Sequence, residues 1–281
     1  MSCSLIADCG STKTDWVLIS DEHGTLEIQT EGINPVRDSQ SAILGILRQQ
    51  LRPRLPIKTN GLEHIHFYGA GCLPPFSQII IDCLQQVFPT TRLYVESDLL
   101  GAARALCGHH EGIACILGTG SNSCLFDGTD IIAHTPPLGF ILGDEGSGSV
   151  LGRKLVSKIL KGLMTTHLIK AFKEQYDLEM SDIINKVYRQ AQPNKFLASF
   201  VPFLSEHRAE PEIHQLLTEE FRNFLMHNIM PYGRKDLPLH FVGSIAYVFQ
   251  QELQESLQKE GYQLGQVLRQ PALELAKYHQ S

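Results

Sequence analysis

The sequence predicts an α/β protein made of two similar halves. Apolar runs of strand length alternate with stretches in which apolar residues recur at helical spacing. The first half opens with three short strands, over 4–8, 14–20 and 25–30, separated by polar turns. The same order restarts at Ile113 with another three-stranded meander. Two halves that open in the same way indicate an internal duplication.

The first half continues as alternating helices and strands. A helix is predicted from Ser39 to Leu51, with Ser39 or Ser41 available as the N-cap. Pro74 and Pro75 mark the start of a second helix, because proline fits the first turn of a helix. The predicted elements are a strand over 64–68, a helix that ends at Val87, a strand over 92–95 and a helix over 99–106.

The second half is richer in helices and ends with one more strand–helix unit. The predicted helices cover 148–161, 166–175, 181–190, 196–207, 213–230 and 245–257, and a strand covers 239–242. The apolar segment 271–278 is predicted as a helix that packs back on another domain.

These elements define the predicted domains. We expect an N-terminal domain over 1–107 and a larger C-terminal domain over 108–263 with a helical insertion. A C-terminal helical segment over 264–281 is expected to dock on the first domain.

Composition and charge narrow the function. A net charge of −6 lacks the basic surface of a nucleic-acid-binding protein. No apolar run approaches the roughly 18 residues that span a bilayer, and the N-terminus lacks the pattern of a signal peptide, so we expect a cytoplasmic protein without a membrane partner. The seven cysteines form no CxxC pair and are predicted to be reduced core residues.

Two glycine-rich turns stand between Ile113 and Ser149. The first reads Gly118-Thr119-Gly120-Ser121-Asn122, and the second reads Gly143-Asp144-Glu145-Gly146-Ser147. Glycine lets backbone N–H groups approach an anion closely, because it lacks a Cβ atom. Tight hairpin turns would explain the same glycines, so both interpretations stand for this stretch alone.

Four motifs in this order carry a family resemblance. They read DCGSTKT at Asp8–Thr14, SDLLGAA at Ser97–Ala103, GTGSN at Gly118–Asn122 and GDEGS at Gly143–Ser147. Together they resemble the N-acetylglucosamine kinase and BadF-type ATPase family, within the superfamily of sugar kinases, actin and heat-shock ATPases. The resemblance implies two duplicated ribonuclease-H-like domains, the actin-like ATPase fold, with a cleft between them for ATP and Mg²⁺. It also implies a homodimer.

Phosphoryl transfer requires backbone donors around the phosphates, a magnesium site and a group that orients the attacking hydroxyl. Asp8, at a strand end, is placed to hold hydrated Mg²⁺, although aspartate at this place also starts turns. By resemblance, Asp98 is the catalytic base that accepts the proton of the sugar hydroxyl. As the residue before Leu99 it would also serve as a helix N-cap.

The remaining predicted site residues bind ATP or sugar. The residues expected to contact the ATP phosphates or adenosine are Gly10, Ser11, Thr12, Lys13, Thr14, Gly118, Thr119, Gly120, Gly243 and Ser244. The residues expected to bind the sugar are Asn34, Gly71, Asn122 and Asp144. Turn formation alone would also account for the glycines and for Asn34 before proline, and Lys13 beside a hairpin turn is often a solvated charge.

The sequence therefore predicts an ATP-dependent kinase that phosphorylates a hydroxyl of an amino sugar, N-acetylglucosamine or glucosamine. A BadF-type ATPase that activates a dehydratase is one alternative. It would need correctly placed cysteine ligands for an iron–sulfur cluster shared by two subunits, whereas Cys115 and Cys124 lie in strand-like runs where core packing explains them. A sugar-binding regulator without catalysis is another. The first loop reads Asp-Cys-Gly-Ser, where Asp-Gly-Gly-Gly is common in the family that it resembles.

Overall fold

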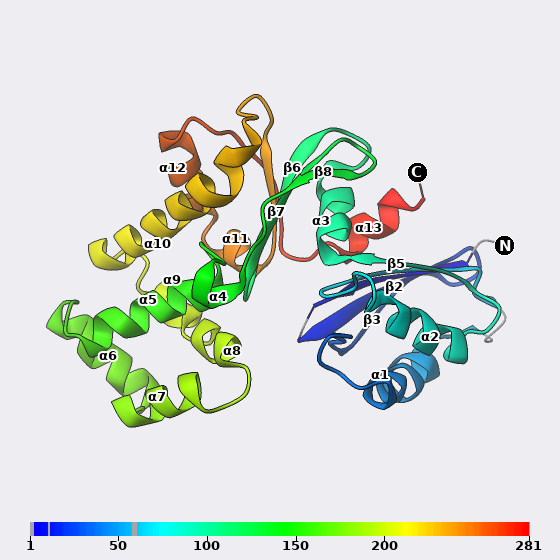
Figure 1. The fold of residues 1–281 in the computed structure, drawn as a ribbon, viewed down its shortest axis with the longest axis horizontal. Helices are drawn as coiled ribbons and strands as arrows, with labels where there is room; N and C mark the ends of the chain where they lie inside the picture. The colour runs from blue at the N-terminus through cyan, green and yellow to red at the C-terminus, as the bar shows by residue number, and fades with distance from the viewer. Residues whose placement is uncertain (1–2, 11, 58–60, 281) are drawn as a thin grey trace. The chain divides into compact units, whose positions relative to one another are not determined.

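The computed structural model describes residues 3–10, 12–57 and 61–280, and they form two compact α/β units (Figure 1). The first unit comprises Met1–His110, Gly128–Asp130 and Gln270–Ser281. The second unit comprises Glu111–Asp127 and Ile131–Arg269. The chain therefore leaves the first unit, builds the second and returns.

The first unit is built on a five-stranded sheet with the order β3-β2-β1-β4-β5. β1 pairs antiparallel with β2 and parallel with β4, and β4 pairs parallel with β5. Cys9 lies opposite Gly69, and Gly69 lies opposite Ser97, so the three parallel strands end at one edge. The strands are β1 (Cys3–Cys9), β2 (Lys13–Ser20), β3 (Gly24–Glu31), β4 (His64–Gly69) and β5 (Arg92–Ser97).

Helices cover both faces of this sheet. Figure 1 shows α1 and α2 on one side and α3 with α13 on the other. α2 buries Ile80, Cys83, Leu84 and Val87, which recur at helical spacing and point into the core. The helices are α1 (Gln40–Ile46), continued by a π-helical turn (Leu47–Leu51) and a 3₁₀ turn (Arg52–Arg54), α2 (Ser77–Val87), α3 (Asp98–Cys107) and α13 (Ala272–Tyr278).

The second unit repeats this topology. Its sheet has the order β10-β9-β6-β7-β8, with antiparallel β6–β7–β8 and parallel β6, β9 and β10. Ile116 and Leu268 both lie opposite Val242, so the parallel strands again end at one edge. The strands are β6 (Gly112–Leu117), β7 (Ser121–Phe126), β8 (Ile131–His134), β9 (Leu239–Val242) and β10 (Leu264–Leu268). The predicted duplication is confirmed in the topology.

A helical insertion between β8 and β9 makes the second unit larger. Buried aromatic residues such as Phe200, Phe203 and Phe221 form its core with the sheet. The insertion contains α4 (Gly139–Leu142), α5 (Gly148–Leu160), α6 (Thr166–Tyr176), α7 (Met180–Tyr188), α8 (Pro193–Ala198), α9 (Val201–Glu206), α10 (Pro211–Phe224), a π-helical turn (Leu225–Ile229) and a 3₁₀ turn (Met230–Tyr232). Between β9 and β10 lie α11 (Ser244–Val248) and α12 (Gln250–Lys259).

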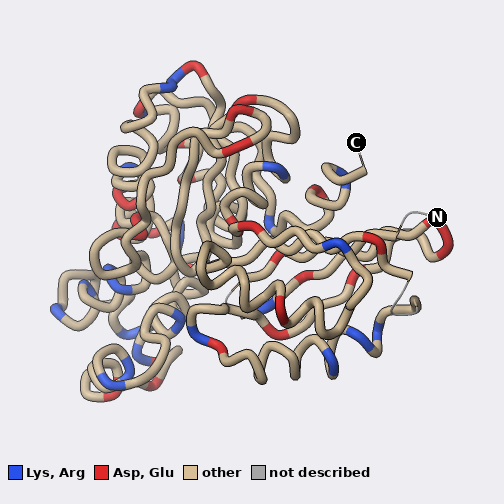
Figure 2. Tube along the Cα trace, turned by 45° about the vertical axis from the view of Figure 1, so that its right-hand side comes forward, with Lys and Arg blue, Asp and Glu red and all other residues tan. Residues whose placement is uncertain are grey.

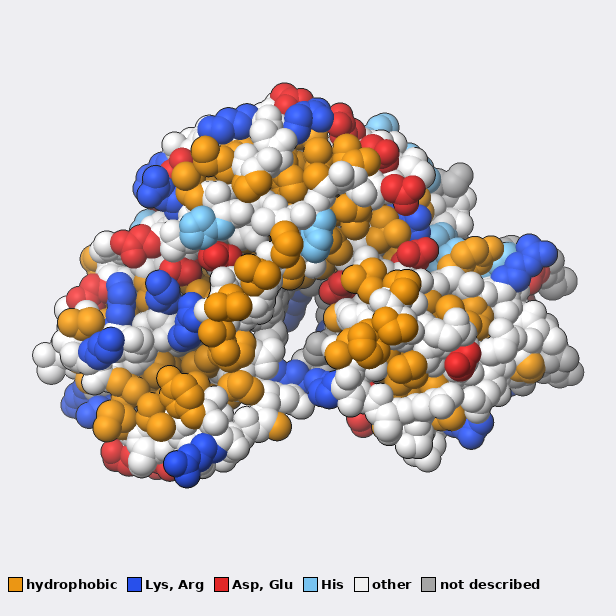
Figure 3. All heavy atoms as spheres, in the orientation of Figure 1, with side chains coloured by type: hydrophobic (Ala, Val, Ile, Leu, Met, Phe, Trp, Pro, Cys, Tyr) orange, Lys and Arg blue, Asp and Glu red, His pale blue; other side chains and the backbone are white. Residues whose placement is uncertain are grey.

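The surface carries charges of both signs and some apolar side chains. Lys and Arg residues are interspersed with Asp and Glu residues along the trace (Figure 2). Hydrophobic side chains gather over α7 (Figure 3), where Met180, Ile184 and Tyr188 are exposed. Among the described helices, none is both long and apolar enough to cross a membrane.

Three predicted helices differ from the structure. The segment over 264–281 is not helical throughout, because Leu264–Leu268 forms β10 and only Ala272–Tyr278 is helical. The helix predicted over 196–207 is divided into α8 and α9, and Pro202 in the first turn of α9 cannot donate a backbone hydrogen bond to the preceding turn. The helix predicted over 245–257 is divided at Phe249 into α11 and α12.

Candidate active site

Asp8 lies near the carboxyl end of β1, opposite Asp15 of β2 and Tyr68 of β4. The pKa of Asp8 is raised to about 7, first by burial and then by the carboxylates of Asp15 and Asp98, while Lys13 lowers it. A buried carboxyl group with anionic neighbours is stabilised by a cation. Asp8 is therefore suited to bind a metal ion.

Asp98 is the first residue of α3, at the same sheet edge. The N-cap of this helix is Ser97, whose hydroxyl oxygen accepts a hydrogen bond from the N–H of Leu100. Asp98 Oδ1 accepts a bond from the N–H of Leu99 at 2.9 Å. Burial raises the pKa of Asp98, against this hydrogen bond. The N-cap is thus Ser97, and Asp98 supports the helix start only through its bond to the Leu99 N–H.

The β1–β2 turn contains the predicted phosphate-binding residues. Gly10 donates its N–H to the carbonyl of Lys13 at 3.0 Å, which closes the turn, and Thr12 is exposed. Lys13 Nζ lies 2.7 Å from Asp15 Oδ2, so its charge is paired. Ser11 lies outside the described residues.

Thr14 differs from its predicted role. Its side chain is fully buried, and its hydroxyl donates to the carbonyl of Glu31 at 3.1 Å. Its oxygen also lies 3.0 Å from Cys9 Sγ. A phosphate cannot reach this hydroxyl in the observed conformation, so Thr14 supports the hairpin instead of offering a hydroxyl donor.

The structure brings together Asn34 and Gly71, two predicted sugar-binding residues. Gly71 has φ +78°, and a Cβ atom there would lie 3.2 Å from Asn34 Oδ1 and 3.0 Å from Val36 Cγ2. Asn34 Oδ1 accepts a hydrogen bond from the N–H of Val36 at 3.0 Å, which fixes the amide. Glycine is therefore favoured at this position by its positive φ and by the close approach of the Val36 and Asn34 side chains.

In the second unit, two glycine turns meet at the carboxyl ends of β6 and β9. Gly118 donates its N–H to the carbonyl of Gly120 at 2.9 Å. The Gly118 carbonyl accepts a bond from Gly148 N–H at 2.8 Å, which ties the turn to the start of α5. Gly243 has φ +123°, and a Cβ atom there would overlap the carbonyl oxygen of Leu117. The Gly243-Ser244 pair therefore lies beside the Gly118–Gly120 turn.

Asp144 lies against the same turn. It has φ +54°, and its Oδ1 accepts a hydrogen bond from the N–H of Ser121 at 3.3 Å. A Cβ atom on Gly120 would lie 3.1 Å from Asp144 Oδ2. Burial raises the pKa of Asp144 to about 6, with a smaller contribution from Glu145 and against the Ser121 hydrogen bond. The second predicted glycine turn thus delivers a carboxyl group to the first.

Asn122 lies at the start of β7. Its Oδ1 accepts hydrogen bonds from Ser123 N–H at 3.0 Å and from His134 Nε2 at 2.9 Å. These bonds fix the orientation of the amide, because an oxygen only accepts. The two bonds to Oδ1 therefore hold the Nδ2 group of Asn122 in a fixed orientation, in which it can donate a hydrogen bond.

Glu145 organises a polar network that the sequence analysis did not identify. Glu145 Oε1 lies 2.9 Å from His227 Nδ1, and Oε2 accepts a bond from Asn228 Nδ2 at 3.2 Å. Burial alone would raise the pKa of Glu145, but hydrogen bonds from its own backbone and from these two side chains lower it below the ordinary value. The partners are about 80 residues apart, so no local spacing indicates them.

Each unit thus gathers its predicted residues at one sheet edge. The first unit supplies carboxyl groups with raised pKa values, which suit a metal ion and a proton acceptor. The second unit supplies backbone N–H groups in glycine turns, which suit phosphate.

The chain is similar to several solved structures. The chain is 47% identical to the "Putative N-acetylglucosamine Kinase" of Porphyromonas gingivalis, with a TM-score of 0.94, over 99% of this chain and 98% of that chain. A protein of the same description from Chromobacterium violaceum has a TM-score of 0.76 at 17% identity, with 99% of both chains covered. MreB 5 of Spiroplasma citri has a TM-score of 0.55 at 9% identity, over 99% of this chain and 95% of that chain.

The similarities to the Chromobacterium violaceum and Spiroplasma citri proteins, at 17% and 9% identity, show the fold alone. No family model matches the chain, and no curated protein matches it. The identity to the Porphyromonas gingivalis protein extends over nearly the whole of both chains. This chain therefore belongs to the N-acetylglucosamine kinase family and has the actin-like ATPase fold of two duplicated α/β domains.

Proposed function

We propose that this protein is an ATP-dependent kinase that transfers the γ-phosphate to a hydroxyl group of an amino sugar, N-acetylglucosamine or glucosamine. The observation that carries the proposal is the position of Asp98 in a chain of this family. It heads α3 beside Asp8, and Ser97 rather than Asp98 caps the helix. A carboxylate held in this way is available for chemistry.

In this proposal, Asp98 accepts the proton of the attacking sugar hydroxyl. The hydroxyl oxygen forms a bond to the γ-phosphorus, and the bond from that phosphorus to the bridging oxygen of ADP breaks. The raised pKa of Asp98 makes it a stronger base than an exposed aspartate, provided that the pH keeps it ionised. Asn34, next to Gly71, is assigned to a sugar hydroxyl.

Asp8 is assigned to magnesium. The site fits a hydrated divalent cation, because Asp8 is buried near Asp15 and Asp98 and its pKa is raised to about 7. When bound, Mg²⁺ neutralises charge on the phosphates and on the departing ADP. Asp8 holds the cation through its carboxylate, and Lys13 remains paired with Asp15.

The second unit is assigned to phosphate, adenosine and sugar contacts. The N–H groups of Thr119 and Gly120 are assigned to phosphate, since that of Gly118 closes the turn, and Gly243-Ser244 is assigned to adenosine. Asn122 donates through Nδ2 and Asp144 accepts through its carboxylate, so the two bind sugar hydroxyls. The fixed amide of Asn122 supports this role.

The cysteine positions favour the kinase over an iron–sulfur ATPase. Cys115 and Cys124, on β6 and β7, are completely buried in the second unit. Ligands for a cluster shared by two subunits must reach the surface. Core packing is the simpler explanation for both thiols.

The test is a coupled ADP assay with Mg²⁺, ATP and a panel of amino sugars. We expect ADP formation that depends on sugar, with N-acetylglucosamine or glucosamine as the best acceptor. Equal ADP formation without sugar would identify an ATPase. Sugar binding by calorimetry without ADP formation would identify a regulator. Sedimentation of the same preparation tests the homodimer that the family resemblance implies.

A further inference from the structure

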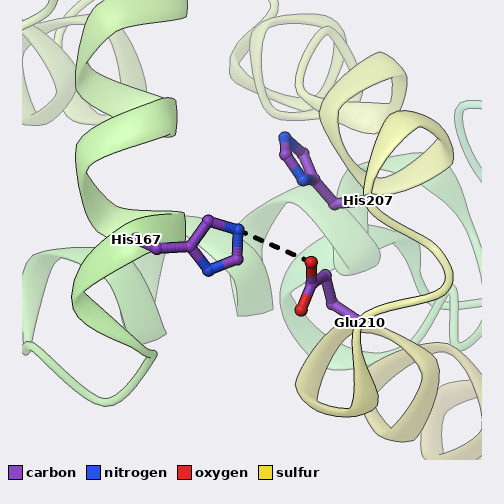
Figure 4. A group of neighbouring side chains, drawn as sticks. All are labelled: His167, His207 and Glu210. Atoms are coloured by element: carbon purple, nitrogen blue, oxygen red, sulfur yellow. Dashed lines mark ion pairs between the residues drawn. The ribbon is translucent and has the colours of Figure 1, made fainter.

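Three side chains with metal-binding atoms meet in the helical insertion of the second unit. His167 lies in the first turn of α6, His207 directly follows α9, and Glu210 directly precedes α10. One ligand atom from each lies within 4.8 Å of the other two. Figure 4 shows the imidazole of His167 directed at the carboxylate of Glu210, with His207 beside them. His167 Nε2 and Glu210 Oε1 are 3.5 Å apart.

The backbone holds these residues together. Glu210 donates its N–H to the carbonyl of His207 at 2.9 Å, which closes the turn between α9 and α10. Thr165, which precedes α6, donates its N–H to Glu212 Oε2 at 2.9 Å. This bond fixes the start of α6 against the start of α10. The cluster therefore depends on three anchored helix ends.

The side chains are oriented as in a metal site. His167 Nδ1 lies 3.5 Å from the hydroxyl oxygen of Thr165, so Nε2 is the nitrogen directed toward Glu210. A histidine that binds a metal through one ring nitrogen usually has a hydrogen-bond partner on the other. The ring of His207 packs on Phe203 with centroids 4.3 Å apart, which restricts its rotation.

The ligand set selects the kind of cation. Two imidazoles and one carboxylate suit Zn²⁺ and related transition metals, whereas Mg²⁺ prefers oxygen ligands. Ligands about 2.1 Å from Zn²⁺ in a tetrahedron lie roughly 3.4 Å from one another. The 3.5 Å between His167 Nε2 and Glu210 Oε1 matches this value, and the other pairs lie within 4.8 Å, so side-chain rotation of His207 is needed to close the site.

We propose that His167, His207 and Glu210 bind one divalent transition-metal ion, with Zn²⁺ as the best fit and water in the fourth position. The ion links α6 to the turn between α9 and α10. This site contains none of the residues assigned to phosphoryl transfer, so it stands independently of the proposed kinase activity.

The experiment titrates the chelator-treated full-length protein with Zn²⁺ against a chromophoric competitor. We expect one equivalent to bind, with an affinity at least tenfold lower in His207→Ala and in Glu210→Gln. Co²⁺ is expected to give the visible absorption of a tetrahedral complex in the unmodified protein only.

The matched control is His214→Ala. His214 Nε2 lies 2.9 Å from Glu255 Oε2 in the same unit, but this pair is not part of a three-ligand group among the described residues. We expect the control to bind Zn²⁺ like the unmodified protein. Equal binding by all variants, or equal loss in the control, would overturn the proposal.

Thermal unfolding gives a second measurement. Zn²⁺ is expected to raise the Tm of the unmodified protein and of His214→Ala, but not that of Glu210→Gln, whereas Mg²⁺ acts on all three alike. Glu210→Gln keeps the size of the side chain, so it remains informative if His207→Ala folds poorly. An equal Zn²⁺ effect on all three proteins would contradict the site.

Discussion

The two units share one sheet topology but place different chemistry at the corresponding edge. β5 of the first unit ends at Ser97 and is followed by Asp98, whereas β10 of the second unit ends at Leu268 and is followed by Arg269. Asp8 lies opposite Asp15, whereas the equivalent strand pair places Ile116 opposite Asn122. The first edge therefore carries neighbouring carboxylates, and the second carries glycine turns and an amide with the single carboxylate of Asp144 against them.

The duplication accounts for the turns that the two units share, but not for the carboxylates of the first unit. The repeated sheet gives both units a three-residue turn after the first strand and a glycine-containing turn after the fourth. Carboxylates with raised pKa values need burial and charged neighbours, as at Asp8. Backbone donors need only a turn without side chains in the way. One framework thus carries both the cation site and the anion site that we propose.

The largest expected effect comes from removing the carboxylate at the first edge. Asp98→Asn should lower kcat by roughly 10²–10⁴-fold, because the proton acceptor is lost while the size is kept. Sugar binding by calorimetry should remain within about threefold of the original value, since a factor of three is worth less than 1 kcal/mol. The matched control is Asp82→Asn, on the exposed side of α2, which should leave kcat unchanged. If Asp98→Asn retained turnover, Asp98 would not be the catalytic base.

The next prediction concerns the glycines that follow the fourth strand along the chain in each unit, Gly71 after β4 and Gly243 after β9. Gly243→Ala should lower Tm by roughly 4–8 °C, because φ +123° is strained and the new Cβ would overlap the Leu117 carbonyl. Gly71→Ala should cost less, because its nearest neighbours are the side chains of Val36 and Asn34, which can move. Differential scanning calorimetry measures the Tm of both variants. A larger loss in Gly71→Ala would reverse the comparison.

The third effect is a pH dependence of stability without Mg²⁺. Asp8 has a pKa of about 7 in the folded protein, well above the ordinary value, so the folded state binds the extra proton. Stability should therefore fall as the pH rises from about 4, the ordinary carboxyl pKa, to about 7 and level off above pH 7, and Mg²⁺ should restore it. Asp144, with a pKa of about 6, should contribute a fall that starts at the same pH and ends near pH 6.

Asp8→Asn and Asp144→Asn assign these two transitions. The two pH ranges overlap below pH 6, so only the fall in Tm between pH 6 and 7 belongs to Asp8 alone. Asp8→Asn should remove this part of the fall, whereas Asp144→Asn should keep it and reduce the fall below pH 6. A profile of Asp8→Asn that still falls between pH 6 and 7 would show that another group titrates there.

The smallest effect concerns the aromatic stack beneath α13 in the first unit. His66 stacks on Tyr94 and on His279, with centroids 4.7 and 3.7 Å away. Burial, together with His279 and other cationic neighbours, lowers the pKa of His66 to about 3, and burial with Arg104 lowers that of His279 to about 4. Both rings stay neutral in the folded state while the unfolded chain takes up protons.

Stability is therefore complete above pH about 6.5, the ordinary histidine pKa, and is lost as the pH falls toward 4. His66→Phe keeps a ring in the stack and should reduce the Tm loss between pH 7 and 5 by about 2–4 °C. The exposed residue His23 provides the control, because His23→Ala should leave this loss unchanged. An unaltered profile in His66→Phe would place the transition elsewhere.

Local sequence patterns predicted most of the fold. The strand alternation in 14–20 and the helical spacing from Ile80 to Val87 reflect burial that each element carries in its own residues. β10 was missed because its stability is not local. Gly265 leaves room for the ring of His240, whose Nδ1 accepts a hydrogen bond from Gln266 N–H at 3.0 Å.

The candidate site was predictable only in part, for a related reason. The motif order indicated Asp8 and Asp98, but no sequence rule decides whether Ser97 or Asp98 caps the helix. The burial of the Thr14 hydroxyl depends on Glu31, which is 17 residues away. The cluster of His167, His207 and Glu210 joins helix ends that no spacing relates, so it becomes visible only in three dimensions.

The return of the chain to the first unit has a consequence for biosynthesis. α13 packs on α3 and on β1 and β2, and it buries Ala272, Leu275 and Ala276. Synthesis of the second unit ends at Arg269. Synthesis of the first unit starts earlier but ends only after α13 has been made. At about 5–20 residues per second, the ribosome needs many seconds to synthesise the intervening residues. A nascent chain stalled before α13 therefore presents an uncovered apolar face on its oldest part, which limited proteolysis of a chain ending at Gln270 would detect.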